Sequence, residues 1–303
     1  MKRLALAAFF TISTALLARG EVLGVGNFIH VVANLDRSID FYRDAIGLEL
    51  TGAPGPHVFS ANAVVSSLYD APDAQSRVAS FRIPMSEMAV EMVEFQGLTA
   101  TPIRARQQDP GAITLTLMVP DLDAAKARLK GAKTETLSSD AREVVVRDPD
   151  GIFVKLAVGS AGGARFGVAV VDLDKTTRFF REALGFQVPS GAAATSDTAM
   201  RRATLLVPGS AFPVEFTEYK TKDRNPVRAA IHDPGASVLR LRVGDLDVTL
   251  KALKAEGAAV VSVGGEPVNL GRARAVILRE SDNLFLQALE QAPAAGKGPA
   301  PAK

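Results

Sequence analysis

The sequence predicts an α+β protein of four strand-helix-three-strand (βαβββ) modules, paired into two domains that each form a cupped, mixed sheet. Three observations predict this fold class. The chain contains an internal repeat at a constant offset, and each copy contains a second, fainter repeat. Each of the four repeated units carries one helical pattern followed by short strand patterns, which together define a module.

The internal repeat has an offset of 124 residues. Residues 109–112, with the sequence DPGA, recur as residues 233–236, and the strand-like segment 90–95 recurs as 214–219. Self-similarity at one fixed period indicates duplication of a structural unit. The two halves of the chain are therefore expected to share one fold.

Within each half, an apolar strand is followed by a Leu-Asp step and an amphipathic helix that ends near a glycine, as at Gly47 and Gly185. In the second module, strand patterns follow at 133–137, 143–147 and 152–158, and residues 148–151 (DPDG) suit a tight hairpin turn between the last two. Four segments share the strand and helix pattern: residues 28–48, 113–132, 166–186 and 239–258.

The two ends differ from the rest of the chain. Residues 1–20 combine a positive start, an apolar run and small residues near position 20, which is typical of a cleavable signal peptide; an uncleaved anchor is the alternative. Periplasmic or secreted localisation is expected, without a membrane segment after cleavage. We expect a first domain at 21–158, a Gly-rich linker at 159–164, a second domain at 165–290 and a disordered Pro/Ala tail at 291–303.

Composition excludes several classes of site. The chain has no Cys, which excludes disulfides, thiolate zinc sites and cysteine nucleophiles. Its net charge is +2 and no basic block is interleaved with aromatic residues, so no nucleic-acid partner is indicated. The expected partner is a small molecule, and the sequence does not indicate an oligomeric state.

Residues 34–48 and 148–156 carry a family resemblance. With the duplicated module, they make the chain similar, over residues 25–290, to the vicinal oxygen chelate superfamily, which includes glyoxalase I, the bleomycin-resistance proteins and the extradiol dioxygenases. The resemblance implies the glyoxalase/bleomycin-resistance/dioxygenase fold. It is unspecific for chemistry, because one scaffold hosts lyases, isomerases, dioxygenases and catalytically silent binders.

The resemblance also implies where a divalent metal would be held in each cup: by a residue eight before the Leu of the Leu-Asp step, and by a Glu on the last strand. No His occupies any of these positions, and Lys and Arg have no lone pair to offer a metal. We therefore predict no metal, and an ion pair in its place in each cup. In the first cup the positions fall on Asn27, Glu91, Thr114 and Lys155, with Glu91 paired to Lys155; in the second they fall on Arg165, Glu215, Gln287 and Val238, with Glu215 paired to Arg165.

Three functions remain open. The first is an exported, metal-free protein without a cofactor that binds a small molecule in the cup. The second is a lyase or dioxygenase that uses Fe, Mn, Ni or Zn with non-standard ligands, for which His30 and Glu91 are the candidates and Glu91 is the best catalytic candidate. Strand alternation places His30 on the face opposite Asn27, which favours a structural role instead. The third is an extracytoplasmic interaction protein with vestigial cups.

Overall fold

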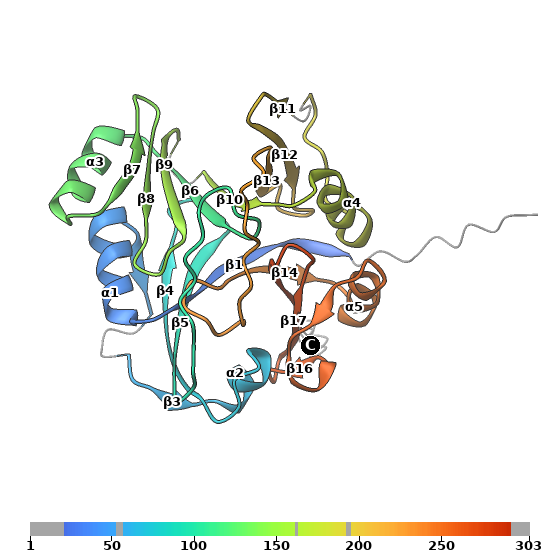
Figure 1. The fold of residues 1–303 in the computed structure, drawn as a ribbon. Coiled ribbons are helices and arrows are strands. Elements are labelled where there is room, and N and C mark those ends of the chain that lie inside the picture. Colours follow the sequence, from blue (N-terminus) through green and yellow to red (C-terminus); the bar gives the residue numbers. More distant parts are fainter. Residues whose placement is uncertain (1–20, 53–56, 161–162, 192–194, 292–303) are drawn as a thin grey trace, which may run out of the picture.

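The computed structural model describes residues 21–52, 57–160, 163–191 and 195–291 (Figure 1). The predicted signal peptide, residues 161–162 of the predicted linker and residues 292–303 of the predicted tail lie outside the described residues. Ala164 and Gln291, predicted to belong to the linker and the tail, are instead the first residue of strand β10 and the last residue of strand β18.

The predicted α+β class and its four modules are confirmed. Module 1 contains β1 (Val22–Val32), α1 (Leu35–Asp40), the π-helical turn η1 (Phe41–Ile46), β2 (Glu49–Thr51), β3 (Ser60–Ala61), α2 (Ala63–Leu68), β4 (Gln75–Arg82) and β5 (Ala89–Gln96). Module 2 contains β6 (Ile113–Val119), α3 (Leu122–Gly131), β7 (Thr136–Ser139), β8 (Glu143–Arg147) and β9 (Phe153–Val158).

The second half follows the same order. Module 3 contains β10 (Ala164–Ala169), α4 (Leu173–Leu184), β11 (Thr195–Ser196), β12 (Met200–Leu206) and β13 (Pro213–Tyr219). Module 4 contains β14 (Ser237–Val243), α5 (Leu246–Ala255), β15 (Ala259–Val260), the 3-10 turn η2 (Val263–Gly265), β16 (Val268–Asn269), β17 (Ala273–Arg279) and β18 (Phe285–Gln291). Within the described residues, no helix is long and apolar enough to cross a membrane.

The residue before each Leu-Asp step fixes the start of a helix. Its extended backbone and side-chain oxygen let it accept a hydrogen bond from the backbone N–H three residues later, which satisfies a donor that the first helical turn leaves free. Gly47 and Gly185 end η1 and α4 with positive φ angles of 89° and 70°, a conformation that glycine adopts without steric cost. The four capping residues are Asn34, Asp121, Asp172 and Asp245.

The modules pair across the repeat rather than within each half. The first sheet has ten strands and joins modules 1 and 4 through the antiparallel pair β1 and β14; its main order is β15-β17-β18-β14-β1-β5-β4-β2. The second sheet has eight strands and joins modules 2 and 3 through β6 and β10, in the order β11-β12-β13-β10-β6-β9-β8-β7. The expectation that residues 21–158 and 165–290 would each form their own cup is therefore wrong.

The lengths of the connections explain this pairing. Residues 159–163 join β9 directly to β10, and Met118 N donates to Gly163 O beside them, so modules 2 and 3 become neighbours in one sheet.

Modules 1 and 2, and likewise 3 and 4, are joined by the longer segments 97–112 and 220–236. These two segments bind each other reciprocally, because Thr101 N donates to Asp233 Oδ1 at 2.7 Å and Asn225 N donates to Asp109 Oδ1 at 2.9 Å. The repeated Asp-Pro-Gly motif thus fastens one half of the chain to the other.

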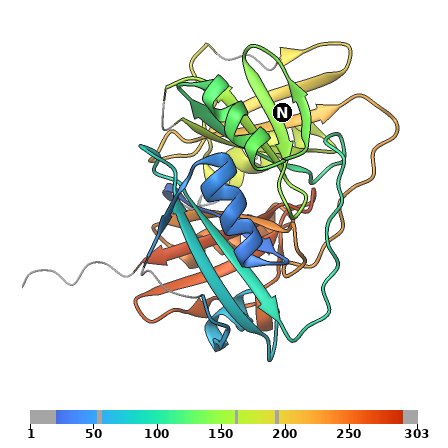
Figure 2. The same cartoon turned by 90° about the vertical axis from the view of Figure 1, so that its left-hand side faces the viewer.

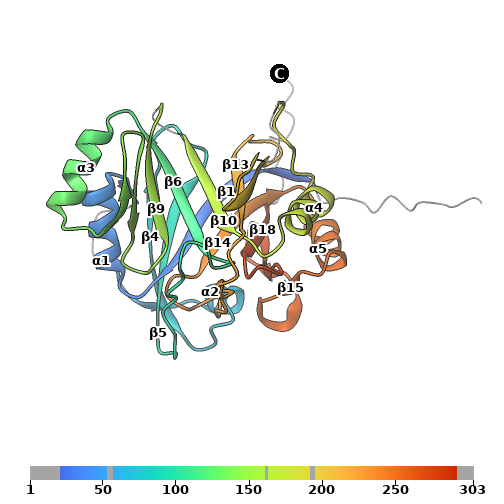
Figure 3. The same cartoon turned by 45° about the horizontal axis from the view of Figure 1, so that its top comes forward.

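The main core lies between the two sheets. The rings of Phe28 on β1 and Phe166 on β10 lie 5.7 Å apart, which places the inner faces of both sheets in contact. Helices α1 and α3 flank this contact on one side and α4 and α5 on the other (Figures 1 and 3), and their apolar faces belong to the same buried cluster. Figure 2 shows the second sheet stacked above the first. The outer faces of the sheets therefore point away from each other.

The outer face of the first sheet is filled. Helix α2, which the sequence analysis did not predict, lies in the long connection 48–74 and packs over β16 and β17. Its Leu68 and the following Tyr69 are buried against apolar residues of the sheet such as Val93 and Ile277. The equivalent connection in module 3, residues 186–199, is shorter and carries no helix in its described part.

The DPDG hairpin of module 2 inserts into module 1 as a buried polar lock. Asp148 Oδ1 accepts the backbone N–H groups of residues 150, 151 and 152, while its Oδ2 lies 2.9 Å from His30 Nε2 and accepts from the Tyr42 hydroxyl at 3.1 Å. Asp150 accepts from Ala33 N at 2.9 Å and from Ser38 Oγ at 2.9 Å. His30 is 0% exposed, and it lies on the inner face as predicted.

We expect His30→Gln to lower the free energy of unfolding by roughly 3 kcal/mol, because it removes the cationic partner of the buried Asp148 carboxylate. Burial alone would lower the pKa of His30, but the Asp148 carboxylate, with Asp150 further off, raises it above its ordinary value of 6.5. The protonated form thus contributes stability that is full below the unfolded pKa and is lost as pH rises through the folded pKa. Urea titrations should show a larger loss near pH ~5.5 than near pH ~9.

The matched control is His57→Gln, in a loop of the same module, which should leave stability nearly unchanged at both values of pH. An equal loss for His30→Gln across this range would contradict an ion pair between His30 and Asp148.

Candidate functional site

The two outer faces are built from equivalent residues, which lie in matching rows across the central strands. On the first sheet, one row runs through Glu91, Ile29 and Val238, and the side chains of Asn27, Arg240 and Gln287 lie one step further along the strands. On the second sheet, the equivalent rows are Glu215, Gly167 and Thr114, and Arg165, Thr116 and Lys155. We call the outer face of the first sheet the closed cup and that of the second sheet the open cup.

In the closed cup, three of the predicted site residues, Asn27, Glu91 and Gln287, form a hydrogen-bonded quartet with Arg240. The Glu91 carboxylate accepts from Asn27 Nδ2 at 2.8 Å and from Arg240 Nη1 and Nη2 at 3.2 and 3.1 Å. Arg240 Nε also donates to Gln287 Oε1 at 2.6 Å. The guanidinium lies between the oxygens that a dication would need, so these residues neutralise each other and do not fit a metal.

Tyr69 lies buried near Glu91 and Arg240 on the same face of the sheet. Its hydroxyl is buried without a hydrogen-bond partner among the described residues. Burial, and to a smaller degree the Glu91 carboxylate, raise the pKa of this phenol, which therefore stays protonated. Tyr69 belongs with Ile29 and Val238 to one buried apolar cluster on this face, while the Glu91 and Arg240 side chains keep an exposed fraction of 19% each.

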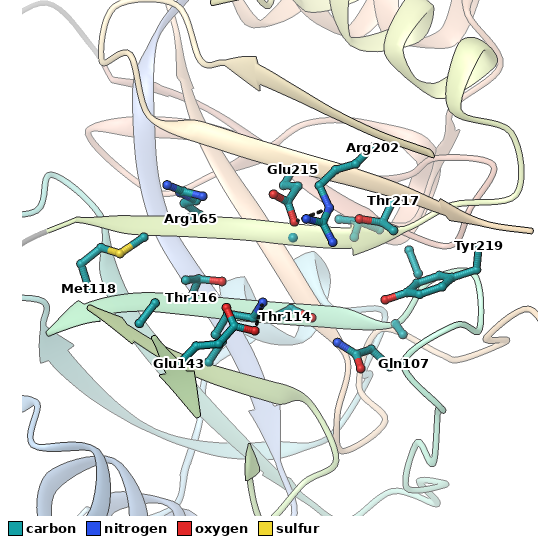
Figure 4. A pocket seen from close by; sticks show the side chains of 16 residues that line it. Gln107, Thr114, Thr116, Met118, Glu143, Arg165, Arg202, Glu215, Thr217 and Tyr219 are labelled. Atoms are coloured by element: carbon teal, nitrogen blue, oxygen red, sulfur yellow. Dashed lines mark ion pairs between the residues drawn. The ribbon is translucent and has the colours of Figure 1, made fainter. Parts of the chain in front are cut away.

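The open cup contains a cavity of about 150 Å³ (Figure 4). Its wall combines three cations and two carboxylates with hydroxyl and amide groups, and Tyr219 and Gln107 lie at the end opposite Met118 and Arg165. Burial raises the pKa of Tyr219, so that its hydroxyl remains a donor. The charged residues of the wall are Lys155, Arg165, Arg202, Glu143 and Glu215.

Gly167 keeps the floor of this cavity open. It takes the place that Ile29 has in the closed cup, and a Cβ atom here would lie 3.2 Å from Thr114 O. Thr114 likewise replaces Val238, so the floor is both lower and more polar than its counterpart. The closed cup is filled and the open cup is not because the residues at these equivalent positions differ in size.

The charges of the open cup are only partly balanced. Lys155 Nζ lies 2.9 Å from Glu143 Oε1, and Arg202 Nε lies 3.3 Å from Glu215 Oε1. Arg165 forms no ion pair within the described part of the chain. One positive charge therefore remains without a carboxylate partner.

The structure regroups the predicted site residues. Asn27 and Glu91 lie in the closed cup with Gln287 and Val238, whereas Thr114 and Lys155 lie in the open cup with Arg165 and Glu215. The predicted pairs of Glu91 with Lys155 and of Glu215 with Arg165 do not form, because the members of the first pair belong to different sheets and Arg202 takes the partner role in the second.

The candidate metal pair of His30 and Glu91 is not brought together either. Their strands are adjacent, but Glu91 faces the closed cup while His30 is buried on the inner face of the same sheet. Within the described residues, one group of His, Asp and Glu side chains is compact enough for a metal: His30, Asp148 and Asp150. The same atoms already bind the hairpin, the Tyr42 hydroxyl and the start of α1. These contacts explain why the three side chains lie close together without a cation.

Sequence reasoning missed the residues that complete both cups: Arg240, Arg202, Glu143, Thr116, Gly167 and Tyr219. The repeat contained a usable signal for two of them, since Thr116 and Arg240 are separated by the same 124 residues as the other repeated segments. Arg240 was overlooked because counting eight residues back from the Leu selects Val238. A register irregularity between Val25 and Phe28 in β1 brings Arg240, two residues further on, beside Asn27.

Known proteins share this architecture. Glyoxalase I from Zea mays aligns with a TM-score of 0.62 at 14% identity, over 89% of this chain and 92% of that protein. A protein described as a putative dioxygenase from Bacillus subtilis aligns with a TM-score of 0.58 at 13% identity, over 91% of this chain and 87% of that one. Identities this low show the fold alone. No curated protein sequence matches the chain significantly.

Sequence profiles of one family match both halves of the chain, at residues 24–156 and 165–275. The matches agree with the duplicated modules and with the fold that the two solved structures share. The chain therefore belongs to the Glyoxalase/Bleomycin resistance protein/Dioxygenase superfamily.

Proposed function

We propose that the protein binds a small polar molecule in the open cup, without a metal. The observation that carries the proposal is the cavity between β6, β9, β10 and β13, where convergent polar side chains surround about 150 Å³ of space. This is well above the roughly 10–15 Å³ that a cavity needs to hold one water, so the cavity has room for several water-sized groups. A ligand of similar size is expected.

The closed cup supports the assignment by contrast. There, apolar side chains and α2 fill the equivalent space, and the quartet satisfies its own charges. In the open cup, Gly167 and two threonines stand in place of Ile29, Val238 and Arg240, while the cations Arg165 and Lys155 stand in place of Asn27 and Gln287. The alternative of vestigial cups fits the first sheet only.

The chemistry of the wall supports binding without a metal. Two of the four positions that the family uses for a dication carry Lys155 and Arg165, which offer no lone pair and would repel a second cation. The other two carry Glu215, already beside Arg202, and Thr114. A metal-dependent lyase or dioxygenase would require a richer set of oxygen or nitrogen donors.

Filling the floor should abolish binding. The variant Gly167→Ile places the isoleucine of the closed cup at the equivalent position of the open cup. A thermal-shift screen of small metabolites first identifies ligands of the natural protein. We expect the variant to bind these ligands at least tenfold more weakly, because its side chain occupies the cavity. Isothermal titration calorimetry measures the loss. If Gly167→Ile folds poorly, Thr116→Met is the substitute variant, because it fills the same floor from the neighbouring strand.

Thr136→Ile is the matched control, since it adds an apolar side chain to an exposed strand of the same sheet outside the cup. It should leave affinity unchanged. Retention of binding in both filled variants would place the ligand elsewhere and refute the proposal.

Chelation should have no effect on binding. We expect dialysis against EDTA to leave the affinity for such a ligand within twofold, and elemental analysis of the purified protein to find well under one equivalent of Fe, Mn, Ni or Zn per chain. About one bound dication per cup, with ligand affinity lost on chelation, would support the metal-dependent alternative.

We also propose that the protein is exported, from the signal-like pattern of residues 1–20. Expression of the full chain should yield a mature protein that begins near residue 21 in the periplasmic or secreted fraction. Mass spectrometry of the N-terminus in fractionated cells checks this. An intact N-terminus in the cytoplasmic fraction would be the contrary result.

A further inference from the structure

The uncompensated charge of the open cup lies at one end of the cavity. Arg165, Thr116 and Lys155 are direct neighbours in one row across β10, β6 and β9. With adjacent strands about 4.8 Å apart, the two cations flank the threonine with their Cα atoms about 10 Å from each other. Both are long side chains that line the cavity, so their charged groups can converge on a ligand above Thr116.

The closed cup shows what an equivalent row can hold. In that row, Asn27 and Arg240 bind the carboxylate of Glu91, which reaches them from the next strand. In the open cup the equivalent glutamate, Glu215, lies beside Arg202 instead. The Arg165-Thr116-Lys155 row thus keeps its donors, and although Glu143 lies beside Lys155, no carboxylate of the described residues pairs with Arg165.

The charge count points in the same direction. The wall of the open cup carries three cations against two carboxylates, whereas the quartet of the closed cup is neutral, with Arg240 against Glu91. One further negative charge would balance the open cup. At the other end, Tyr219, Gln107 and Thr217 offer neutral hydrogen-bonding groups, which suit a hydroxyl or carbonyl rather than a second charge.

From these observations we infer that the ligand of the open cup is a small monocarboxylate whose carboxylate lies over Thr116, between Arg165 and Lys155, with its uncharged polar end toward Tyr219. This inference rests on the proposed function. Arg165 binds a carboxylate oxygen pair as a planar fork, Lys155 adds a point charge, and the threonine hydroxyl donates from below. The ligand carboxylate takes the role that Glu91 has in the closed cup.

Matched acids and amides test the inference. The probes are lactate with lactamide, glycerate with glyceramide and benzoate with benzamide, because each pair differs in charge but hardly in shape. Isothermal titration calorimetry at low ionic strength should show at least one acid that binds tenfold or more tightly than its amide. Arg165→Gln and Lys155→Gln should each weaken that acid about fivefold or more and leave the amide unaffected.

Lys130→Gln, an exposed lysine on α3 outside the cup, is the control and should leave both affinities unchanged. Acids that bind no better than their amides, or acids unaffected by both cup variants, would overturn the inference. Failure of the proposed function looks different: in that case no compound, charged or neutral, binds in a manner sensitive to Gly167→Ile. A neutral ligand that Gly167→Ile abolishes would preserve the proposed function and refute the monocarboxylate.

Discussion

The pairing of β1 with β14, and of β6 with β10, is the constraint on which both cups depend. These two antiparallel contacts join modules from opposite halves of the chain, so each cup takes one wall from residues 21–158 and the other from residues 164–291. Arg240 can reach Glu91, and Arg165 can lie beside Thr116, only because of this exchange. The chemistry of each cup is therefore a property of the whole chain rather than of either repeat.

Two devices hold the exchanged modules in place. The crossing segments bind each other through the repeated Asp109 and Asp233. The DPDG hairpin is locked into module 1 by His30, Tyr42 and the first turn of α1. In the second half, the equivalent hairpin has Asp282 in place of Asp150, and Asp282 accepts a hydrogen bond from Thr176 Oγ1 at 2.7 Å. Glu280 takes the place of Asp148. Burial, and then the Asp282 carboxylate, raise the pKa of Glu280 above its ordinary value. The two hairpins therefore have the same position in the fold but different polar contacts.

The two cups differ at equivalent positions of the repeat. The closed cup has α2 in its longer connection and fills its floor with Ile29 and Val238, while the open cup has Gly167 and Thr114 at the same positions. Such a division is physically coherent, since a filled cup adds apolar burial to the core while an open one keeps polar groups available to a ligand. The closed cup has Arg240 bound to Glu91, whereas the open cup has Lys155 beside Glu143 and Arg165 outside any ion pair of the described residues.

Local patterns in the sequence specify the four modules, the caps of their main helices, the DPDG hairpin and the inner position of His30, because capping, turn chemistry and alternation act over a few residues. The sequence also identified Glu91, Lys155, Arg165 and Glu215 as cup residues. Which of these residues meet depends on how the modules pair. Four modules of similar pattern can pair in more than one way, and periodicity specifies the face of a strand but not its partner. The short connection at 159–163 and the reciprocal binding of the crossing segments select the observed pairing, and with it the separation of Glu91 from Lys155.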